Sequence, residues 1–123
     1  MNINLLDINI TDRWMRKIIA KRKNNLTWEP GYEAGNEWKY IDIENDELGL
    51  ICILNNYAIE FGIITIFLNK KLDILDRKMI FDSKELSLKM RSDSSVSLIV
   101  HPSIHWMIEC IDMNIIRCGK TRY

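Results

Sequence analysis

The pattern of hydrophobic and polar positions at the start of the chain predicts a strand followed by a helix. Residues 2–10 alternate roughly between polar and apolar side chains, which is typical of a short strand. Thr11 and Asp12 then offer a helix N-cap. Beyond them an apolar stripe with a basic back predicts an amphipathic helix of about three turns, ending at Asn24-Asn25. The stripe consists of Trp14, Met15, Ile18, Ile19 and the stem of Arg22.

The middle of the chain changes to patterns that favour strands. Residues 26–37 lack periodicity and contain turn residues, so we expect a surface loop there. Residues 38–44 have a period of two, with Trp38, Tyr40, Asp42 and Glu44 on one face and Lys39, Ile41 and Ile43 on the other. The runs 48–54 and 57–68 are rich in β-branched and aromatic residues, and Asn55-Asn56 between them suits a tight hairpin. Weaker alternation over 70–91, including Leu86, Leu88 and Met90, and the run 96–100 suggest further strands.

The segment 103–118 fits either a strand or a helix. Six apolar positions from Ile104 to Cys118 fit one helical face, with Gly119 as a stop. The same segment alternates strictly from Ile104 to Cys110, and a strand would need a slip near Cys110-Ile111. Its β-forming residues favour the strand. The sequence therefore predicts an α+β fold: an N-terminal helix packed on a mainly antiparallel β-sheet of about five to seven strands.

Length and charge narrow the class of protein. The 123 residues predict a single domain spanning 1–123, and the 47% hydrophobic content is typical of a globular chain. The formal net charge is zero, so no global field draws the chain to DNA or an anionic membrane. No signal peptide is recognisable, and the longest apolar run, 57–68, contains Glu60 and is too short to span a bilayer. Three cysteines without a CxxC pair suggest free thiols in the cytoplasm, with Cys52 in the core.

Candidate catalytic chemistry is sparse. His101, His105 and Glu109 share one side of either a strand or a helix, but a fourth metal ligand is not evident, so we expect no metal and no cofactor. The two histidines could instead form the acid–base pair of a ribonuclease, with Lys120 or Arg122 as the cation. No phosphate loop, nucleophile elbow or zinc-protease motif is present. We therefore expect no catalytic residues and no enzymatic activity.

Residues 13–23 carry six bases and no acid, which is the second feature of interest. Lysines and arginines on one helix face can follow the phosphates of a nucleic acid. The only aromatic residue of this segment, Trp14, belongs to the apolar stripe rather than to the basic face. A solvated basic face is the preferred interpretation, and a small nucleic-acid-binding protein or ribonuclease remains the alternative function.

Residues 28–47, which we name the acid–aromatic segment, hold seven acids, one base and four large aromatic residues. Spaced carboxylates along an extended segment imitate a row of phosphates, and Tyr and Trp supply rigid contact area at low entropic cost. A cationic partner would be steered to such a surface. The predicted partner-binding residues are Trp28, Glu29, Tyr32, Glu33, Glu37, Trp38, Asp42 and Glu44.

With this segment, its Ile-, Asn- and Lys-rich composition and its lack of catalytic signatures, the chain resembles the small bacterial immunity proteins. These proteins neutralise toxins of contact-dependent growth inhibition and related polymorphic toxin systems. The resemblance implies a non-catalytic inhibitor that binds a cognate protein toxin one to one in the cytoplasm. The toxin would be a cationic nuclease domain whose active site is covered, with no contact to membrane or nucleic acid. A secretion chaperone or a phage anti-defence protein would use the same kind of surface.

Overall fold

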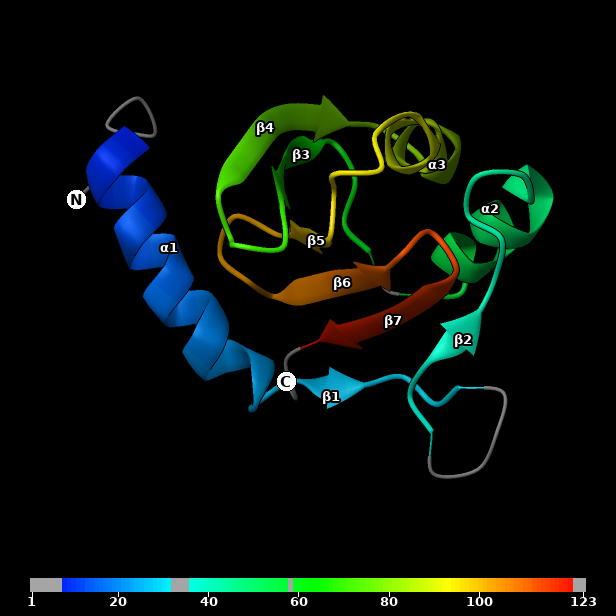
Figure 1. The fold of residues 1–123 in the computed structure, drawn as a ribbon, viewed down its shortest axis with the longest axis horizontal. Coiled ribbons are helices and arrows are strands. Elements are labelled where there is room, and N and C mark those ends of the chain that lie inside the picture. The colour runs from blue at the N-terminus through cyan, green and yellow to red at the C-terminus, as the bar shows by residue number, and fades with distance from the viewer. Residues whose placement is uncertain (1–7, 32–35, 58, 121–123) are drawn as a thin grey trace.

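The computed structural model describes residues 8–31, 36–57 and 59–120, and for residues 8–15 it describes the backbone alone. Within these ranges the α+β prediction is confirmed (Figure 1). The elements in chain order are α1 (Ile8–Lys23), β1 (Thr27–Trp28), β2 (Lys39–Tyr40), α2 (Glu47–Asn55), β3 (Ile63–Leu68), β4 (Ile74–Ile80), α3 (Ser83–Ser92), β5 (Leu98–Val100), β6 (Trp106–Ile111) and β7 (Ile115–Lys120). No helix among the described residues has the length and apolar character needed to cross a bilayer.

The seven strands form one sheet in the order β1-β7-β6-β5-β3-β4, and β2 pairs with β7 beside β1. Every pairing between the described strands is antiparallel. The long hairpin of β6 and β7 lies at the middle of this arrangement, and the short strands β1 and β2 extend β7 outward (Figure 1). The acid–aromatic segment is thereby attached along the β7 side of the sheet.

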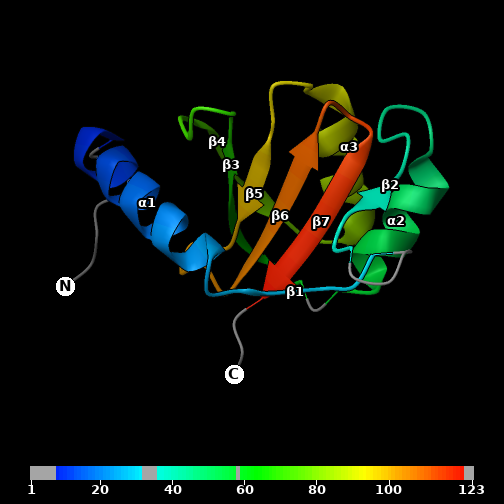
Figure 2. The same ribbon diagram turned by 60° about the horizontal axis from the view of Figure 1, so that its bottom comes forward.

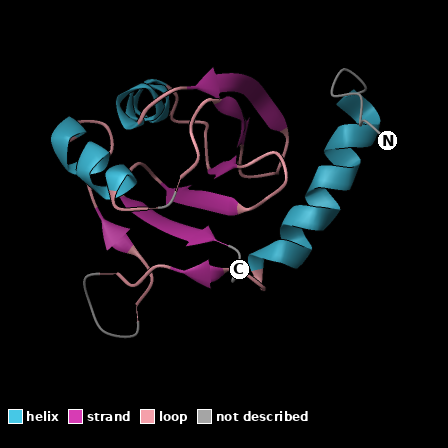
Figure 3. Cartoon of the chain, turned by 180° about the vertical axis from the view of Figure 1, so that it is seen from behind, coloured by secondary structure: helices cyan, strands magenta, loops and turns pink. Residues whose placement is uncertain are grey.

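Helices cover both faces of the sheet. One core cluster combines α2 and α3 with the sheet face that carries Phe67, Ile99 and Ile108. The other places Ile19 of α1 against the opposite face, with Leu68 and Met107 among its members. Figure 2 shows α1 on one side and the two shorter helices on the other. From behind, α2 and α3 lie next to each other, and they contact directly (Figure 3).

The prediction of a strand over 48–54 is wrong, because these residues belong to α2. The side chain of Asp46 caps this helix by accepting a hydrogen bond from the Gly49 N–H at 2.9 Å. A Cβ on Gly49 would lie 2.4 Å from Asp46 Oδ2, so glycine permits the cap. Leu50, Ile53 and Leu54 are buried at helical spacing. The Asn55-Asn56 pair predicted as a hairpin is the C-terminal end of this helix.

Residues 83–92 form α3, so the strand-like alternation of Leu86, Leu88 and Met90 was also misleading. The Asp82 side chain accepts from the Glu85 N–H at 2.8 Å, and the Phe81 N–H donates to Glu85 Oε2 at 3.2 Å. Together these bonds form a variant of the capping box, in which Glu85 reaches the N–H of the residue before the N-cap, and they fix the start of the helix. Leu86 and Met90, one turn apart, are buried, whereas Leu88 is exposed.

The preference for strands over 103–118 is confirmed, and the helix alternative and the helix stop at Gly119 are wrong. The expected slip near Cys110-Ile111 is a hairpin turn between β6 and β7. Asp112 and Met113 have φ angles of 52° and 60°, the left-handed conformation that tight hairpin turns require. Gly119 lies within β7, where a Cβ would approach Trp28 Cε3 to 2.9 Å.

Other predicted boundaries shift by several residues. Of the strand expected over 2–10, residues 2–7 lie outside the described ranges and residues 8–10 begin α1. The helix ends at Lys23, before Asn24-Asn25 as predicted. The strand expected over 38–44 shortens to β2, and the one over 57–68 begins only at Ile63.

Candidate functional site

Arg117 of β7 contacts two of the aromatic side chains of the acid–aromatic segment, Trp28 and Trp38. Its guanidinium carbon lies 3.8 Å from the centroid of the Trp28 ring and 4.5 Å from that of Trp38. These are cation–π distances, at which a partly desolvated guanidinium and an indole attract by about 1–2 kcal/mol. The Trp28 Nε1–H also donates to the Lys23 carbonyl at the end of α1, at 3.3 Å. Both tryptophans are therefore half-buried anchors on the sheet.

The same arginine forms ion pairs with Glu109 and Glu37, and Glu109 in turn pairs with Lys23. Arg117 Nη2 lies 2.7 Å from Glu109 Oε1, and its Nη1 lies 3.5 Å from Glu37 Oε1. The second oxygen of Glu109 accepts from Lys23 Nζ. The side chains of Arg117 and Glu109 are only 15% and 16% exposed, so this network is shielded from solvent. We name Lys23, Trp28, Glu37, Trp38, Glu109 and Arg117 the Arg117 cluster.

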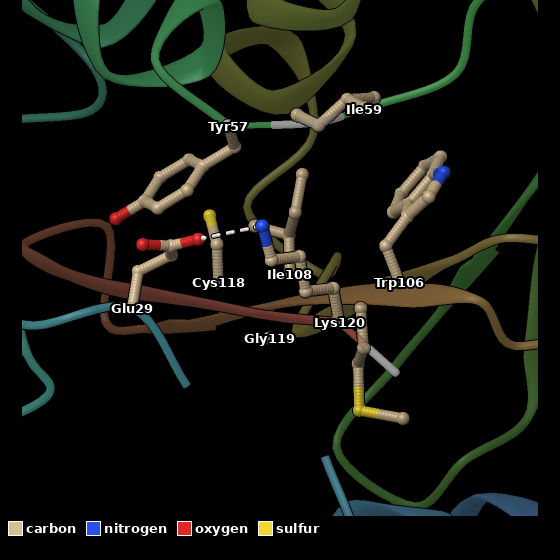
Figure 4. Close-up of a pocket in the computed structure, with 9 residues that line it drawn as sticks. Glu29, Tyr57, Ile59, Trp106, Ile108, Cys118, Gly119 and Lys120 are labelled. Carbon is tan, nitrogen blue, oxygen red and sulfur yellow. Dashed lines mark ion pairs between the residues drawn. The ribbon is translucent and has the colours of Figure 1, made fainter. Parts of the chain in front are cut away.

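Glu29, the next predicted contact residue, lies beside β7. Its Oε1 is 3.6 Å from Lys120 Nζ, and the pair borders a small cavity between the side chains of Tyr57 and Ile59 and the β6–β7 hairpin (Figure 4). Tyr57, Trp106 and Cys118 are among the side chains that line it. A volume near 10 Å³ accommodates no more than about one water molecule, so this cavity is not a substrate site.

Asp42 and Glu44, the remaining described acids of the prediction, are exposed and come directly after the Trp38 end of the Arg117 cluster in the chain. Alternation along residues 40–46 buries Ile43 and turns Tyr40, Asp42 and Glu44 outward. Tyr40 is 65% exposed, and Leu48, in the first turn of α2, is 81% exposed. They are the two most exposed large apolar side chains among the described residues, and they lie close together in the chain. We name Tyr40, Asp42, Glu44, Asp46 and Leu48 the acidic edge.

The eight residues predicted to bind a partner thus separate into three groups. Trp28, Glu29, Glu37 and Trp38 are partly buried and contact Arg117 or Lys120. Asp42 and Glu44 belong to the acidic edge, although Asp42 also accepts hydrogen bonds within its own turn from Asn45. Tyr32 and Glu33 lie outside the described residues. Tyr40 and Leu48 were missed, and the period of two over 38–44 was the signal that could have added Tyr40.

A second constellation joins the two histidines to Glu60. His101 Nε2 lies 3.1 Å from Glu60 Oε2, and His105 Nδ1 lies 3.6 Å from Glu60 Oε1. The two imidazole rings are stacked, with centroids 4.3 Å apart and planes 19° apart. The turn that brings them together holds Ile104 at a φ of 56° with its side chain buried. Glu60, the single charge in the apolar run 57–68, was the available sequence signal.

Hydrogen bonds fix the protonation pattern of His101. The Ser103 N–H donates to His101 Nδ1 at 2.9 Å, so Nδ1 presents a lone pair and Nε2 carries the proton that it donates to Glu60. Burial lowers the pKa of His101, while the neighbouring Glu60 carboxylate acts in the opposite direction. His101 is therefore a neutral imidazole near neutral pH.

This arrangement bears on the ribonuclease alternative. Both ring nitrogens of His101 have partners and its side chain is 9% exposed, which leaves His105 as the histidine that faces solvent. Glu109, considered as a third ligand, is instead held by Lys23 and Arg117. Lys120 pairs with Glu29, and Arg122 lies outside the described residues. No described cation is thereby placed beside the imidazoles.

The basic helix makes only two ion pairs among the described residues. Arg16 pairs with Asp73 and Lys23 with Glu109. Lys17, Lys21 and Arg22 lie along α1, and all three are exposed. The bases of α1 thus pair with acids outside the acid–aromatic segment, and a solvated basic face remains.

The three thiols differ in environment, which gives a direct chemical test of the fold. Cys52 lies on α2 and is exposed, contrary to the predicted core position. Burial raises the pKa of Cys110 to about 12 and that of Cys118 well above its ordinary value, so both stay protonated and unreactive at neutral pH. We expect a thiol reagent to label Cys52 alone in the native protein and all three thiols in denaturant. Counting labelled sites by mass spectrometry, with Cys52→Ser as control, checks this expectation; rapid native labelling of that variant would contradict the burial.

A comparison of the chain with protein-family models, with curated proteins and with solved structures finds no match.

Proposed function

We propose that this protein is an immunity-type inhibitor that binds a cognate toxin domain one to one and covers its active site without catalysis. The observation that carries the proposal is the acidic edge. Its three carboxylates and two highly exposed apolar side chains occupy one continuous stretch of nine residues, 40–48. The producing cell's cytoplasm is the compartment in which such an inhibitor acts.

The chemistry of the acidic edge suits a cationic partner. A nuclease holds the phosphates of its substrate with lysines, arginines or metal ions, and a row of carboxylates can occupy the same positions. Tyr40 and Leu48, one on each side of the acids, supply the apolar contact area that gives an interface most of its affinity. The carboxylates accelerate association and select the partner.

The acidic edge is held in a defined shape before any partner arrives. The Ile41 N–H donates to the Asn114 carbonyl at 2.9 Å, and the Ile43 N–H donates to the Met113 carbonyl at the same distance. Asp46 caps α2, and Ile43 is 1% exposed in the core. A surface fixed in this way loses little conformational freedom on binding, which favours tight association.

The test is co-expression with the C-terminal domain of the protein that the neighbouring upstream reading frame encodes, as the candidate toxin, with growth and complex formation as readouts. We expect the wild-type protein to restore growth and to form a one-to-one complex. The Tyr40→Ala/Glu44→Lys variant should bind at least about tenfold more weakly, with slower association that is less sensitive to salt. Binding kinetics at several salt concentrations measure both effects.

Two leucines provide a matched control. Leu48→Ala should weaken the complex, whereas Leu88→Ala removes the same side chain from an exposed position of α3, 58% against 81% exposed, and should leave binding unchanged. Neither substitution touches the core, so circular dichroism should report folded protein in both cases. Full binding by the Tyr40→Ala/Glu44→Lys variant would move the interface to another surface. Failure of the wild-type protein to bind or protect would remove the proposed function itself.

A further inference from the structure

Glu60, His101 and His105 bring three metal-binding atoms together from two separate segments. All three donors lie within 4.8 Å of one another. The distances from Glu60 to the two imidazole nitrogens are 3.1 and 3.6 Å. A zinc–nitrogen distance of about 2.0–2.1 Å places neighbouring ligands of a tetrahedral site about 3.4 Å apart. These two distances end on different oxygens of Glu60, Oε2 for His101 and Oε1 for His105, and each is close to the spacing of two neighbouring ligands on zinc.

The charge of this group also favours a cation. No lysine or arginine among the described residues pairs with Glu60; its hydrogen-bond and ion-pair contacts there are the two imidazoles. A carboxylate with two imidazoles is a donor set that zinc and related divalent ions accept. Glu60 and His105 are 53% and 56% exposed, so an ion can enter from solvent, while His101 is fixed in the interior.

We propose that Glu60, His101 and His105 bind one divalent transition-metal ion of the zinc class. Three protein ligands leave a fourth coordination position that faces solvent and takes a water molecule. This site is separate from the acidic edge and does not depend on the inhibitor function. It differs from the His101, His105 and Glu109 set suggested by sequence spacing, because Glu109 belongs to the Arg117 cluster.

Metal binding requires two local changes that can be observed. The stacked imidazoles have nearly parallel planes, so their lone pairs cannot converge on one ion until His105 turns out of the stack. His101 must also exchange tautomers: its Nε2 gives its lone pair to the metal, and the proton moves to Nδ1. The Ser103 N–H then loses its acceptor at Nδ1 and turns to water, which its exposed position allows. Both changes are confined to the turn between β5 and β6.

The experiment is a calorimetric titration of untagged, chelator-treated protein with zinc chloride. It is performed in a Cys52→Ser background, because the exposed Cys52 thiol is a competing zinc ligand. We expect one ion per chain, and a visible absorption spectrum of four-coordinate cobalt when cobalt(II) replaces zinc. Glu60→Gln and His105→Ala should each weaken zinc binding at least about tenfold. Asp112→Asn, which removes an exposed carboxylate in the turn between β6 and β7, is the matched control and should bind like the parent.

A second measurement tests His101 without mutating a buried residue. Nitrogen-15 spectra of the imidazoles should report a protonated Nε2 before zinc is added and a protonated Nδ1 afterwards, together with a shift of the Ser103 amide. Absence of zinc binding, or equal binding by Glu60→Gln, would overturn the proposal. Zinc binding without a change of the His101 tautomer would also overturn it, because the site would then lack its buried ligand. Circular dichroism verifies that each variant remains folded.

Discussion

Replacing Arg117 with alanine is expected to lower the free energy of unfolding by about 3 kcal/mol. The substitution removes the partner of Glu109 Oε1, whose side chain is 16% exposed, and two indole rings lose the guanidinium on which they stack. Breaking a buried ion pair leaves a charge that water cannot fully solvate, and this costs about 3–5 kcal/mol. We expect the lower end of that range because Lys23 still contacts the other oxygen of Glu109.

Urea unfolding followed by circular dichroism measures this loss. Arg16→Ala is the matched control, because Arg16 and Asp73 form an ion pair whose side chains are 48% and 44% exposed. That variant should lose less than about 1 kcal/mol. Arg117→Met combined with Glu109→Leu removes both charges and should recover at least half of the stability that Arg117→Ala loses. Equal losses for the Arg117 and Arg16 variants would mean that the cluster is not shielded from water.

Phe67→Ala is expected to destabilise the protein by about 3–5 kcal/mol, the largest effect of any single truncation that we predict. Phe67 lies in β3, an interior strand between β4 and β5, with 0% exposure, and its ring belongs to the core between the sheet and the helices α2 and α3. Truncation loses the transfer free energy of the ring and leaves a cavity that the surrounding sheet cannot close. The side chain of Lys89, 5.4 Å from the ring centroid, also loses its aromatic contact.

Phe81 provides a matched control, because the same Phe→Ala substitution there removes an exposed ring. Phe81 is 62% exposed at the start of α3, and its backbone N–H bond to Glu85 does not depend on the ring. Phe81→Ala should therefore change the free energy of unfolding by less than about 1 kcal/mol. Guanidinium unfolding of the two variants side by side gives the comparison. A small loss for Phe67→Ala would show that the core repacks around the cavity or that this side of β3 is not covered by α2 and α3.

The sequence was more informative about the acidic edge than about the contacts of the Arg117 cluster. The period of two over 38–44 correctly separated Tyr40, Asp42 and Glu44 from the buried Ile43. It gave no sign that Trp28, Trp38 and Glu37 converge on Arg117, because that contact joins residues 80 positions apart in the case of Glu37. The partner of the two histidines was misjudged for the same reason. Glu60 lies 41 positions from His101, whereas the carboxylate at regular spacing, Glu109, pairs with Lys23 and Arg117.

The sequence by itself determined the amphipathic first helix, the β-forming character of residues 63–68, 98–100 and 106–120, and the acidic alternation after β2. The helix and the acidic alternation have a periodicity that survives because one face meets water. Residues 63–68 and 98–100 are largely buried on both faces and are recognised by their β-forming residue types instead. Only the tertiary structure decided that residues 48–54 are a helix, because a segment that is mostly apolar on all sides loses the periodicity that distinguishes the two states. The tertiary structure also decided which charges meet, since the path of the chain through the sheet brings Arg117 to Trp28 and Glu60 to His101. Such contacts depend on strand order, which no local pattern encodes.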